Sequence, residues 1–230
     1  GAWTFWKVRY YGDILPNTYY VKVSSSNSLA RGAMYVYFFF QSYWLILFPL
    51  LLLWFGRALF TKAANRALLI PLAVLILWLL YTVGVGGDFI EFRFLVPVLP
   101  LWFVLVAWII CVQIRTVIIR VVLVAVILVG SLHHAHAFTG DPLNIESISE
   151  LSGHLTNERD GWVRIGQALG AAFDHDPGVT VAVTAGGAIP YYSRLRTIDM
   201  LGLNDRWVAT NGLYLGSRPG HQRIATFAYL

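Results

Sequence analysis

Four long apolar stretches constrain this chain more than any other feature of its sequence. They run over Ala33–Phe55, Ala67–Val85, Phe94–Val112 and Thr116–His133. Each is close to the length of about 20 residues that a helix needs to cross the roughly 30 Å hydrocarbon core of a bilayer. Of the 230 residues, 57% are hydrophobic and 13% are charged, a balance that excludes an ordinary soluble globular domain. The sequence therefore predicts a polytopic α-helical membrane protein with about four transmembrane helices in residues 33–138.

The charges of the connecting loops predict how these helices are oriented. The first and third connections are basic, and their cations are Arg57, Lys62, Arg66, Arg115 and Arg120. The second connection instead carries Asp88, Glu91 and Arg93. Because short loops rich in Lys and Arg stay in the cytoplasm, we expect the second connection to lie outside, together with both flanking segments. The side chain of Arg120, near the start of the fourth stretch, can reach the membrane interface.

Residues 1–32 are predicted to lie at the outer face of the membrane as an interfacial segment. Ten of the chain's twenty-one Trp and Tyr residues occur in its first 44 residues, and Lys7 and Arg9 lie among them. Amphipathic rings prefer the headgroup level, so this pattern is typical of an aromatic belt on a helix along the surface. The turn-forming run at 12–18 breaks that helix, and a polar loop follows at 24–28.

The tail, residues 139–230, is predicted to form a small extracytoplasmic α/β domain. Helical spacing of apolar residues marks 162–173, and a short apolar run at 179–184 predicts a strand. A short helix is expected through Tyr192, with further strands at 197–201 and 224–230. Strand–helix–strand order favours a small α/β layer.

Several classes of protein are excluded or disfavoured by composition and spacing. Residues 1–138 carry ten Lys or Arg and three Asp or Glu, so the basic excess lies in the membrane half and nucleic acid is not indicated. A single Cys excludes a disulfide framework and a Cys-based zinc cluster. The three His at 133, 134 and 136 have ligand-like spacing, but no acid or Cys lies near them in sequence. No cluster demands a metal, and no residue is assigned as a metal ligand.

The second connection, 86–93, is the most informative stretch for chemistry. Two interpretations stay open. The stretch is either a solvated loop with an Asp88–Arg93 ion pair or a polar site. In the polar site, Arg93 binds a phosphate while Asp88 acts as base or orients a hydroxyl. A second polar cluster runs from Tyr10 to Asn17 and on to Lys22, and it reads either as an interface anchor followed by a turn or as part of a site. If the two segments converge, Arg93 and Lys22 share one anionic headgroup.

The order of several short motifs resembles a known family of bacterial membrane enzymes. The segments are YYGDILPNTYYVK at 10–22, GGDF…RFLVP at 86–97, AGGAIPYY at 185–192, DMLGLND at 199–205 and PGH at 219–221. Together they are similar to the GT-C glycosyltransferases that use polyprenyl-phosphate sugars, including actinobacterial terminal arabinofuranosyltransferases. The resemblance implies an inverting transfer of a sugar from a lipid phosphate to a cell-envelope glycan or another acceptor, outside the bacterial cytoplasmic membrane.

The same resemblance implies roles for individual residues. Arg93 would bind the donor phosphate, with Lys22 as the second cation, and Asp88 would be an auxiliary acid. The residues expected to bind substrate are Tyr11, Asn17 and Glu91. Such enzymes usually place an essential acid in a first outer loop and have about twice as many spans, so we expect this chain to be a C-terminal part, inactive alone, with the main base elsewhere. A divalent cation is left open as a cofactor.

A rival reading from another class is a non-catalytic transport or envelope-assembly component whose extracytoplasmic tail binds a partner. Transporters typically carry ionisable residues near mid-span or broken helices in paired positions. The interiors of the four stretches hold several prolines and no charge at mid-span. This pattern favours the enzyme, whose expected partners are the lipid bilayer, a polyprenyl-phosphate sugar and a glycan acceptor.

Overall fold

The computed structural model describes residues 1–22, 28–140, 143–216 and 218–230, without the side chains of Lys22 and Ala64. The chain forms two compact units. The first, here called the helical unit, spans Ser28–Ile145. The second, the mixed unit, joins Gly1–Asn27 to Glu146–Leu230. The N-terminal segment therefore belongs with the tail, whereas composition alone divides the chain after residues 32 and 138.

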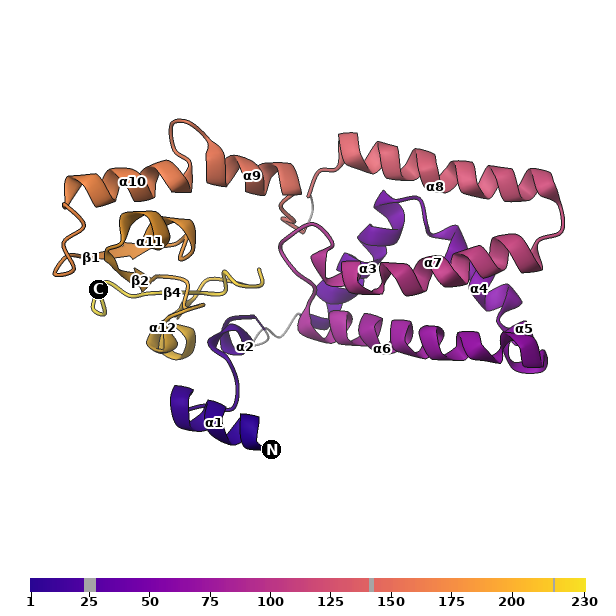
Figure 1. Cartoon of the computed structure of the whole chain (residues 1–230), viewed down its shortest axis with the longest axis horizontal. Coiled ribbons are helices and arrows are strands. Elements are labelled where there is room, and N and C mark those ends of the chain that lie inside the picture. The colour runs from indigo at the N-terminus through magenta and orange to yellow at the C-terminus, as the bar shows by residue number, and fades with distance from the viewer. Residues whose placement is uncertain (23–27, 141–142, 217) are drawn as a thin grey trace. The chain divides into compact units, whose positions relative to one another are not determined.

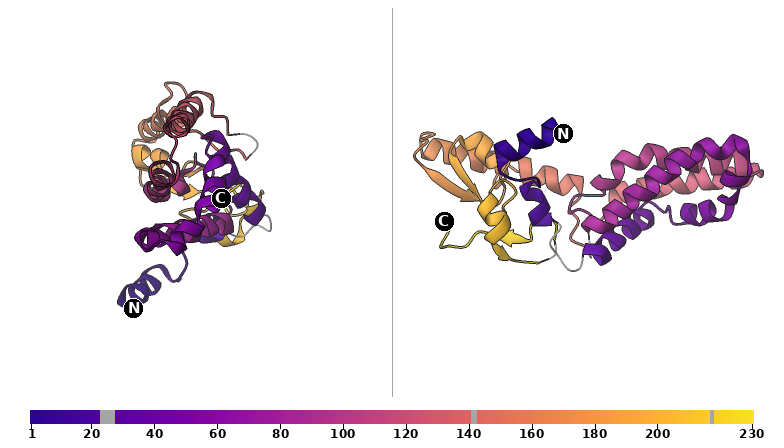
Figure 2. Two further views of the ribbon diagram at one scale, coloured as in Figure 1. Left: turned by 90° about the vertical axis from the view of Figure 1, so that its right-hand side faces the viewer. Right: turned by 90° about the horizontal axis from the view of Figure 1, so that it is seen from below.

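The helical unit consists almost entirely of helices, and in its described residues three runs are long and apolar enough to cross a membrane. These runs are Asn65–Val85, Arg93–Gln113 and Val117–Ala137. Its elements are α3 (Ser28–Ser42), α4 (Leu47–Phe55), α5 (Arg57–Thr61), η1 (Ala63–Leu68), α6 (Leu69–Val85), η2 (Arg93–Val98), α7 (Leu99–Trp108), η3 (Ile109–Gln113) and α8 (Val117–Ala137). Figures 1 and 2 show α6, α7 and α8 running roughly along one direction, and α6 packs on α7 while α8 contacts α3 and η3. The second, third and fourth predicted spans are confirmed as helices of this length.

The first predicted span, Ala33–Phe55, is wrong as a single straight helix. Helix α3 and the following segment Leu47–Thr61, which comprises α4 and α5, meet at an angle of 97°. Pro49 gives the reason, because its ring would collide with the Leu45 carbonyl in a continuous helix, whereas it is tolerated in the first turn of α4. The bent pair starts beside Gly86, at the C-terminal end of α6, and α5 beyond it packs on η1 at the opposite end. The pair thus runs the length of α6 as a broken span would.

The outer surface of the helical unit is apolar and suits hydrocarbon better than water. Ile70, Leu77 and Ile118 are about two-thirds or more exposed, while Phe48, Leu95 and other residues fill a closed core. A contiguous apolar surface of this kind is rare on soluble monomers. Its helices therefore have the form expected of a multi-pass membrane protein.

Arg120 lies near the start of α8, and its guanidinium bonds to backbone carbonyls. Its Nε donates to the Ile114 carbonyl (2.7 Å) and its Nη2 to the Cys111 carbonyl (3.1 Å). These carbonyls lie at the end of η3, where a helix leaves its last acceptors without intrahelical partners. The Arg120 side chain, at the start of α8, therefore supplies hydrogen-bond donors to carbonyls at the end of η3.

The mixed unit holds two small sheets among short helices. Its elements are α1 (Ala2–Tyr11), α2 (Asn17–Lys22), α9 (Ile148–Thr156), α10 (Trp162–Ala172), β1 (Thr180–Val183), α11 (Ala188–Ser193), β2 (Arg196–Asp199), α12 (Arg206–Asn211), β3 (Leu213–Tyr214) and β4 (Arg223–Ile224). Strands β1 and β2 are parallel, with Thr180 opposite Arg196, and α11 connects them. Figure 1 shows α10 and α11 beside this pair.

Most elements predicted for the tail are confirmed, and one is wrong. The helix at 162–173, the strand at 179–184, the short helix through Tyr192 and the strand near 197–201 are present with slightly shifted ends. The strand predicted at 224–230 is limited to β4, which pairs antiparallel with β3. Beyond it the chain turns, and the Tyr229 amide donates to the Thr226 carbonyl. The apolar run lacks a neighbouring strand long enough to extend the ladder.

Gly32 lies where α3 crosses α6, which gives a test of this packing. A Cβ at Gly32 would collide with the Val83 carbonyl oxygen, whereas a Cβ at Gly84, also in α6, would meet nothing within 4 Å. We expect Gly32→Ala to lower the free energy of unfolding by about 1–3 kcal/mol, the usual cost of overpacking. Gly84→Ala should leave it unchanged or raise it, because Ala favours helix. Thermal unfolding in one detergent, followed by Trp fluorescence, compares the two, and equal losses would contradict the packing.

Candidate functional site

The loop between α6 and η2 has a shape that two glycines make possible. Gly86 and Gly87 have φ of 86° and 70°, in the left-handed region that residues with a Cβ rarely adopt. The Gly87 amide donates to the Thr82 carbonyl (3.0 Å) and ends α6. A Cβ at Gly87 would lie 2.6 Å from the Tyr35 ring. The loop therefore folds tightly against α3.

Arg31 on α3 forms hydrogen bonds with this loop, a role that was not predicted from the sequence. The side chain is buried, and its Nη1 donates to the carbonyls of Gly86 (2.9 Å) and Asp88 (3.4 Å). Its Nη2 donates to the Leu143 carbonyl (2.9 Å). A buried cation requires such partners. The signal available in the sequence was a single cation two residues before the first apolar stretch.

Asp88 and Arg93, both predicted site residues, form an ion pair. Asp88 is fully buried, and its Oδ1 accepts a hydrogen bond from the Phe89 amide (2.9 Å) while its Oδ2 pairs with Nη2 of Arg93. The Arg93 side chain is 47% exposed. A buried carboxylate thus fixes a half-exposed guanidinium, whose fork geometry is suited to phosphate or carboxylate.

Glu91, also a predicted site residue, pairs with His134 of α8. Their Oε1 and Nε2 atoms are 2.8 Å apart, and the exposed fractions are 19% for Glu91 and 4% for His134. The Tyr43 ring stacks on the imidazole with 4.0 Å between ring centroids. The pair therefore joins the loop to the end of α8, a contact that sequence spacing could not reveal.

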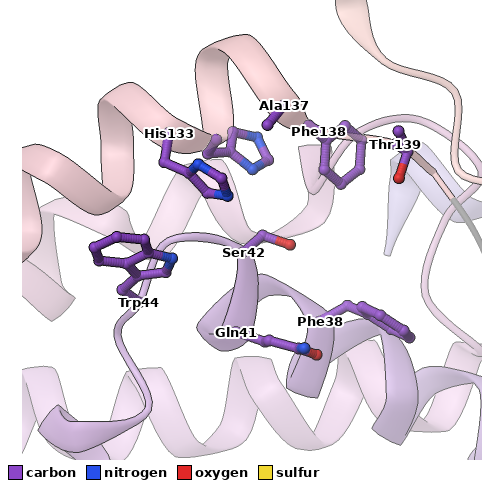
Figure 3. A pocket seen from close by; sticks show the side chains of 9 residues that line it. Phe38, Gln41, Ser42, Trp44, His133, Ala137, Phe138 and Thr139 are labelled. Carbon is purple, nitrogen blue, oxygen red and sulfur yellow. The ribbon is translucent and has the colours of Figure 1, made fainter.

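A cavity of about 250 Å³ opens beside this pair. Its walls are Phe38, Gln41, Ser42, Trp44, His133, His134, Ala137, Phe138 and Thr139. Figure 3 shows Ser42 at the end of α3 across the space from His133 on α8, with Trp44 beside that histidine and Gln41 extending toward Phe38. Amide, hydroxyl and imidazole groups therefore share a small space with three aromatic rings.

The three histidines at the end of α8 diverge and take separate partners. His133 faces the Trp44 ring, His134 pairs with Glu91, and Nδ1 of His136 lies 3.1 Å from the Leu132 carbonyl. Across the described ranges, no three His, Cys, Asp or Glu side chains gather in a way that could hold a metal ion. The spacing of the three histidines along the sequence thus does not translate into a common ligand set.

The second predicted cluster lies in the mixed unit and lines a pocket of about 610 Å³. Tyr11 and Asn17 both contribute to its wall. Arg206, just inside α12, donates from Nη1 to the Tyr11 carbonyl (3.1 Å) and from Nη2 to Oδ2 of Asp13 (3.2 Å). The Lys22 side chain lies outside the described residues, so its joint phosphate site with Arg93 stays a prediction.

The comparisons with known proteins identify one family for part of the mixed unit. Residues 150–228 match the model of a domain family of unknown function (DUF8728). Neither the curated proteins nor the solved structures contain a match. The matched residues include Leu203, Asn204 and Arg206, which form one wall of the pocket.

Asp13 should make the corner between α1 and α2 sensitive to pH. The Leu15 amide, then the Tyr20 hydroxyl and Arg206, hold the pKa of the Asp13 carboxyl below its usual value of 3.8. A carboxyl whose pKa is lowered by folding stabilises the fold above its unfolded pKa, and that contribution is lost as pH falls through the folded value. We expect hydrogen-exchange protection of residues 10–20, corrected for intrinsic rates, to be constant from pH 7 to pH 5 and to fall below about pH 4.

Asp13→Asn is the matched control for this pH dependence. The amide cannot titrate, so the variant should show weaker protection at pH 7 and no further loss on acidification. Protection in the wild-type chain that is independent of pH down to pH 3 would contradict the assigned role of Asp13.

Proposed function

We propose that this chain is part of a membrane glycosyltransferase that moves a sugar from a polyprenyl-phosphate donor to a cell-envelope glycan on the outer face of a bacterial cytoplasmic membrane. The observation that carries the proposal is the half-exposed Arg93, fixed by the buried Asp88 at the end of helices long enough to cross a bilayer. A lipid phosphate lies at the depth of such helix ends. The sequence resemblance described above supports the same reading.

The orientation follows from the charges at the two ends of the helical unit. Arg57, Lys62, Arg66 and Arg115 lie at the end away from the α6–η2 loop, near the start of α6 and the end of η3. With this basic end in the cytoplasm, Arg93 faces the outer side. The donor phosphate then meets the guanidinium at the outer headgroup level.

The cavity beside Glu91 and His134 is where the sugar of the donor would lie. Its volume of about 250 Å³ suits a small polar group better than a drug-sized ligand. Gln41, Ser42 and the imidazoles offer donors and acceptors for hydroxyl groups. Glu91 holds His134 in one orientation and so presets this wall for substrate.

In the transfer, an acceptor hydroxyl oxygen attacks the anomeric carbon as the bond from that carbon to the phosphate oxygen breaks. Polyprenyl phosphate leaves with the electron pair, and the hydroxyl proton passes to a general base. Arg93 stabilises the charge that develops on the leaving phosphate. The auxiliary role of Asp88 is to hold Arg93 in place through their ion pair. Asp88 does not itself transfer a proton in this scheme.

A non-catalytic transport component is the second candidate, and the bent α3–α4 pair favours it, because broken helices are frequent in transporters. Against it, the ionisable side chains of the three continuous candidate spans lie near helix ends. They are Arg66, Arg93, Arg120, His133, His134 and His136. Transfer and transport differ in their products, so one assay separates them.

Arg93→Ala should weaken the binding of polyprenyl phosphate about ten- to a hundred-fold, since a hydrogen bond to a charged group contributes about 1.5–3 kcal/mol. Binding is measured with the purified chain in nanodiscs by native mass spectrometry. Transfer of a radiolabelled sugar from its polyprenyl phosphate is measured in membranes of cells that express the full-length protein of which this chain is proposed to be a part, and it should fall in parallel. Arg115→Ala, which removes an exposed cation at the opposite end, is the matched control.

Two further variants keep this test independent of folding. Arg93→Ala removes the cation that pairs with Oδ2 of the buried Asp88 carboxylate, and Arg93→Ala/Asp88→Asn, which also removes the negative charge, should keep the fold without restoring binding. Arg93→Lys keeps the charge and loses the fork, and we expect an intermediate affinity. Unchanged affinity in the folded double variant would remove Arg93 from the site, and labelled sugar that crosses the membrane without transfer would establish the transport reading.

A further inference from the structure

The pocket of the mixed unit has two walls that come from distant parts of the sequence. One wall is formed by the corner between α1 and α2, including Lys7, Tyr10, Tyr11 and Asn17. The other is formed by Leu203, Asn204 and Arg206 before and inside α12. All these residues lie within one compact unit, and α2 packs on α12.

A buried carboxylate builds the second wall. Asp199, at the end of β2, accepts hydrogen bonds from the amides of Leu201 (3.0 Å) and Asn204 (2.8 Å). Its Oδ2 also accepts from Nδ2 of Asn204 (3.2 Å), which fixes the plane of that amide group. Gly186, after β1, leaves the space that this arrangement needs, since a Cβ there would lie 3.2 Å from the carboxylate. Asn204 is therefore held in place before any ligand arrives.

The first wall is equally fixed, and Arg206 joins it to the second. Asp13 accepts from the Leu15 amide (3.1 Å), from the Tyr20 hydroxyl (2.9 Å) and from Arg206. Nζ of Lys7 donates to the Ile14 carbonyl (2.7 Å). The lining holds two cations and the Asp13 carboxylate, so its net charge is only +1, and both Nη atoms of Arg206 already donate to the first wall.

The chemistry of the lining points to a neutral ligand with many hydroxyl groups. Amide groups at 17 and 204 and the Thr18 hydroxyl both donate and accept hydrogen bonds, while the Tyr10 and Tyr11 rings are mostly exposed. Such rings stack against the C–H faces of sugars, while the hydroxyl groups of the sugar remain hydrogen-bonded. A volume of about 610 Å³ exceeds that of the cavity in the helical unit and lies in the usual range for small-molecule sites.

We propose that this pocket binds two or three residues of a neutral oligosaccharide, as a holding site for the acceptor glycan. The acceptor role rests on the proposed glycosyltransferase function, whereas saccharide binding by the pocket does not. Asn17 and Asn204 bind ring hydroxyls, and Tyr11 stacks on a sugar face. Asp199 and Arg206 act as positioning residues that hold the two walls together.

The test measures the binding of neutral oligosaccharides to the whole chain in nanodiscs. The probes are a linear arabinofuranose hexasaccharide and maltohexaose, and saturation-transfer-difference NMR with a competition titration gives the affinities. We expect Tyr11→Ala and Asn17→Ala each to weaken binding of the preferred hexasaccharide about tenfold. Tyr191→Ala, which removes a still more exposed tyrosine of the same unit outside the pocket, should leave it unchanged.

Three results would overturn the proposal. The first is that the wild-type chain binds neither hexasaccharide. The second is that Tyr11→Ala and wild type bind the hexasaccharide with equal affinity. The third is that Tyr11→Ala loses only its binding to phosphatidylglycerol vesicles, which would identify a membrane contact. Arg93→Ala/Asp88→Asn separates this proposal from the function. If polyprenyl phosphate binds neither wild type nor that variant while the hexasaccharide binds both, the transferase reading fails and the saccharide site stands.

Discussion

The polar end of the helical unit depends on how one buried guanidinium is satisfied. Arg31 brings a full charge into an apolar bundle, where an unpaired cation is very costly. Three backbone carbonyls, from Gly86, Asp88 and Leu143, surround it instead. Those bonds tie α3 to the loop after α6 and to the chain beyond α8. Arg31 therefore determines where the backbone of the Asp88–Arg93 loop lies, although it is not itself exposed to a ligand.

Both polar regions of the protein use a buried carboxylate to hold more exposed groups. In the helical unit Asp88 fixes Arg93, and in the mixed unit Asp199 fixes Asn204. In each case the acid is nearly inaccessible and its partner is exposed. An exposed ion pair contributes little and reorients freely, whereas a pair anchored in the interior keeps one geometry. Each candidate site is thus rigid because an exposed side chain is held by a buried carboxylate.

The sequence predicted local features well and long-range ones poorly. Apolar runs of membrane-spanning length predicted three helices closely, because each run satisfies its own backbone hydrogen bonds. The bend between α3 and α4 was missed although Pro49 was visible, since a single proline can either kink a helix or break it. The pairing of Asp88 with Arg93 could be expected from their spacing. By contrast, Arg31, His134 and Arg206 contact residues 43 to 195 positions away, and no periodicity encodes such contacts.

The way Arg120 is satisfied has a consequence for biogenesis. Both of its acceptors, at Ile114 and Cys111, lie within nine residues of it in the chain. Its guanidinium can therefore form these hydrogen bonds as soon as the hairpin of α7, η3 and α8 has formed, before any other helix is in place. A nascent chain that enters a bilayer as this hairpin would carry its cation already shielded by carbonyls. Assembly of the bundle could then begin at this hairpin and continue toward the bent α3–α4 pair, which lies earlier in the chain.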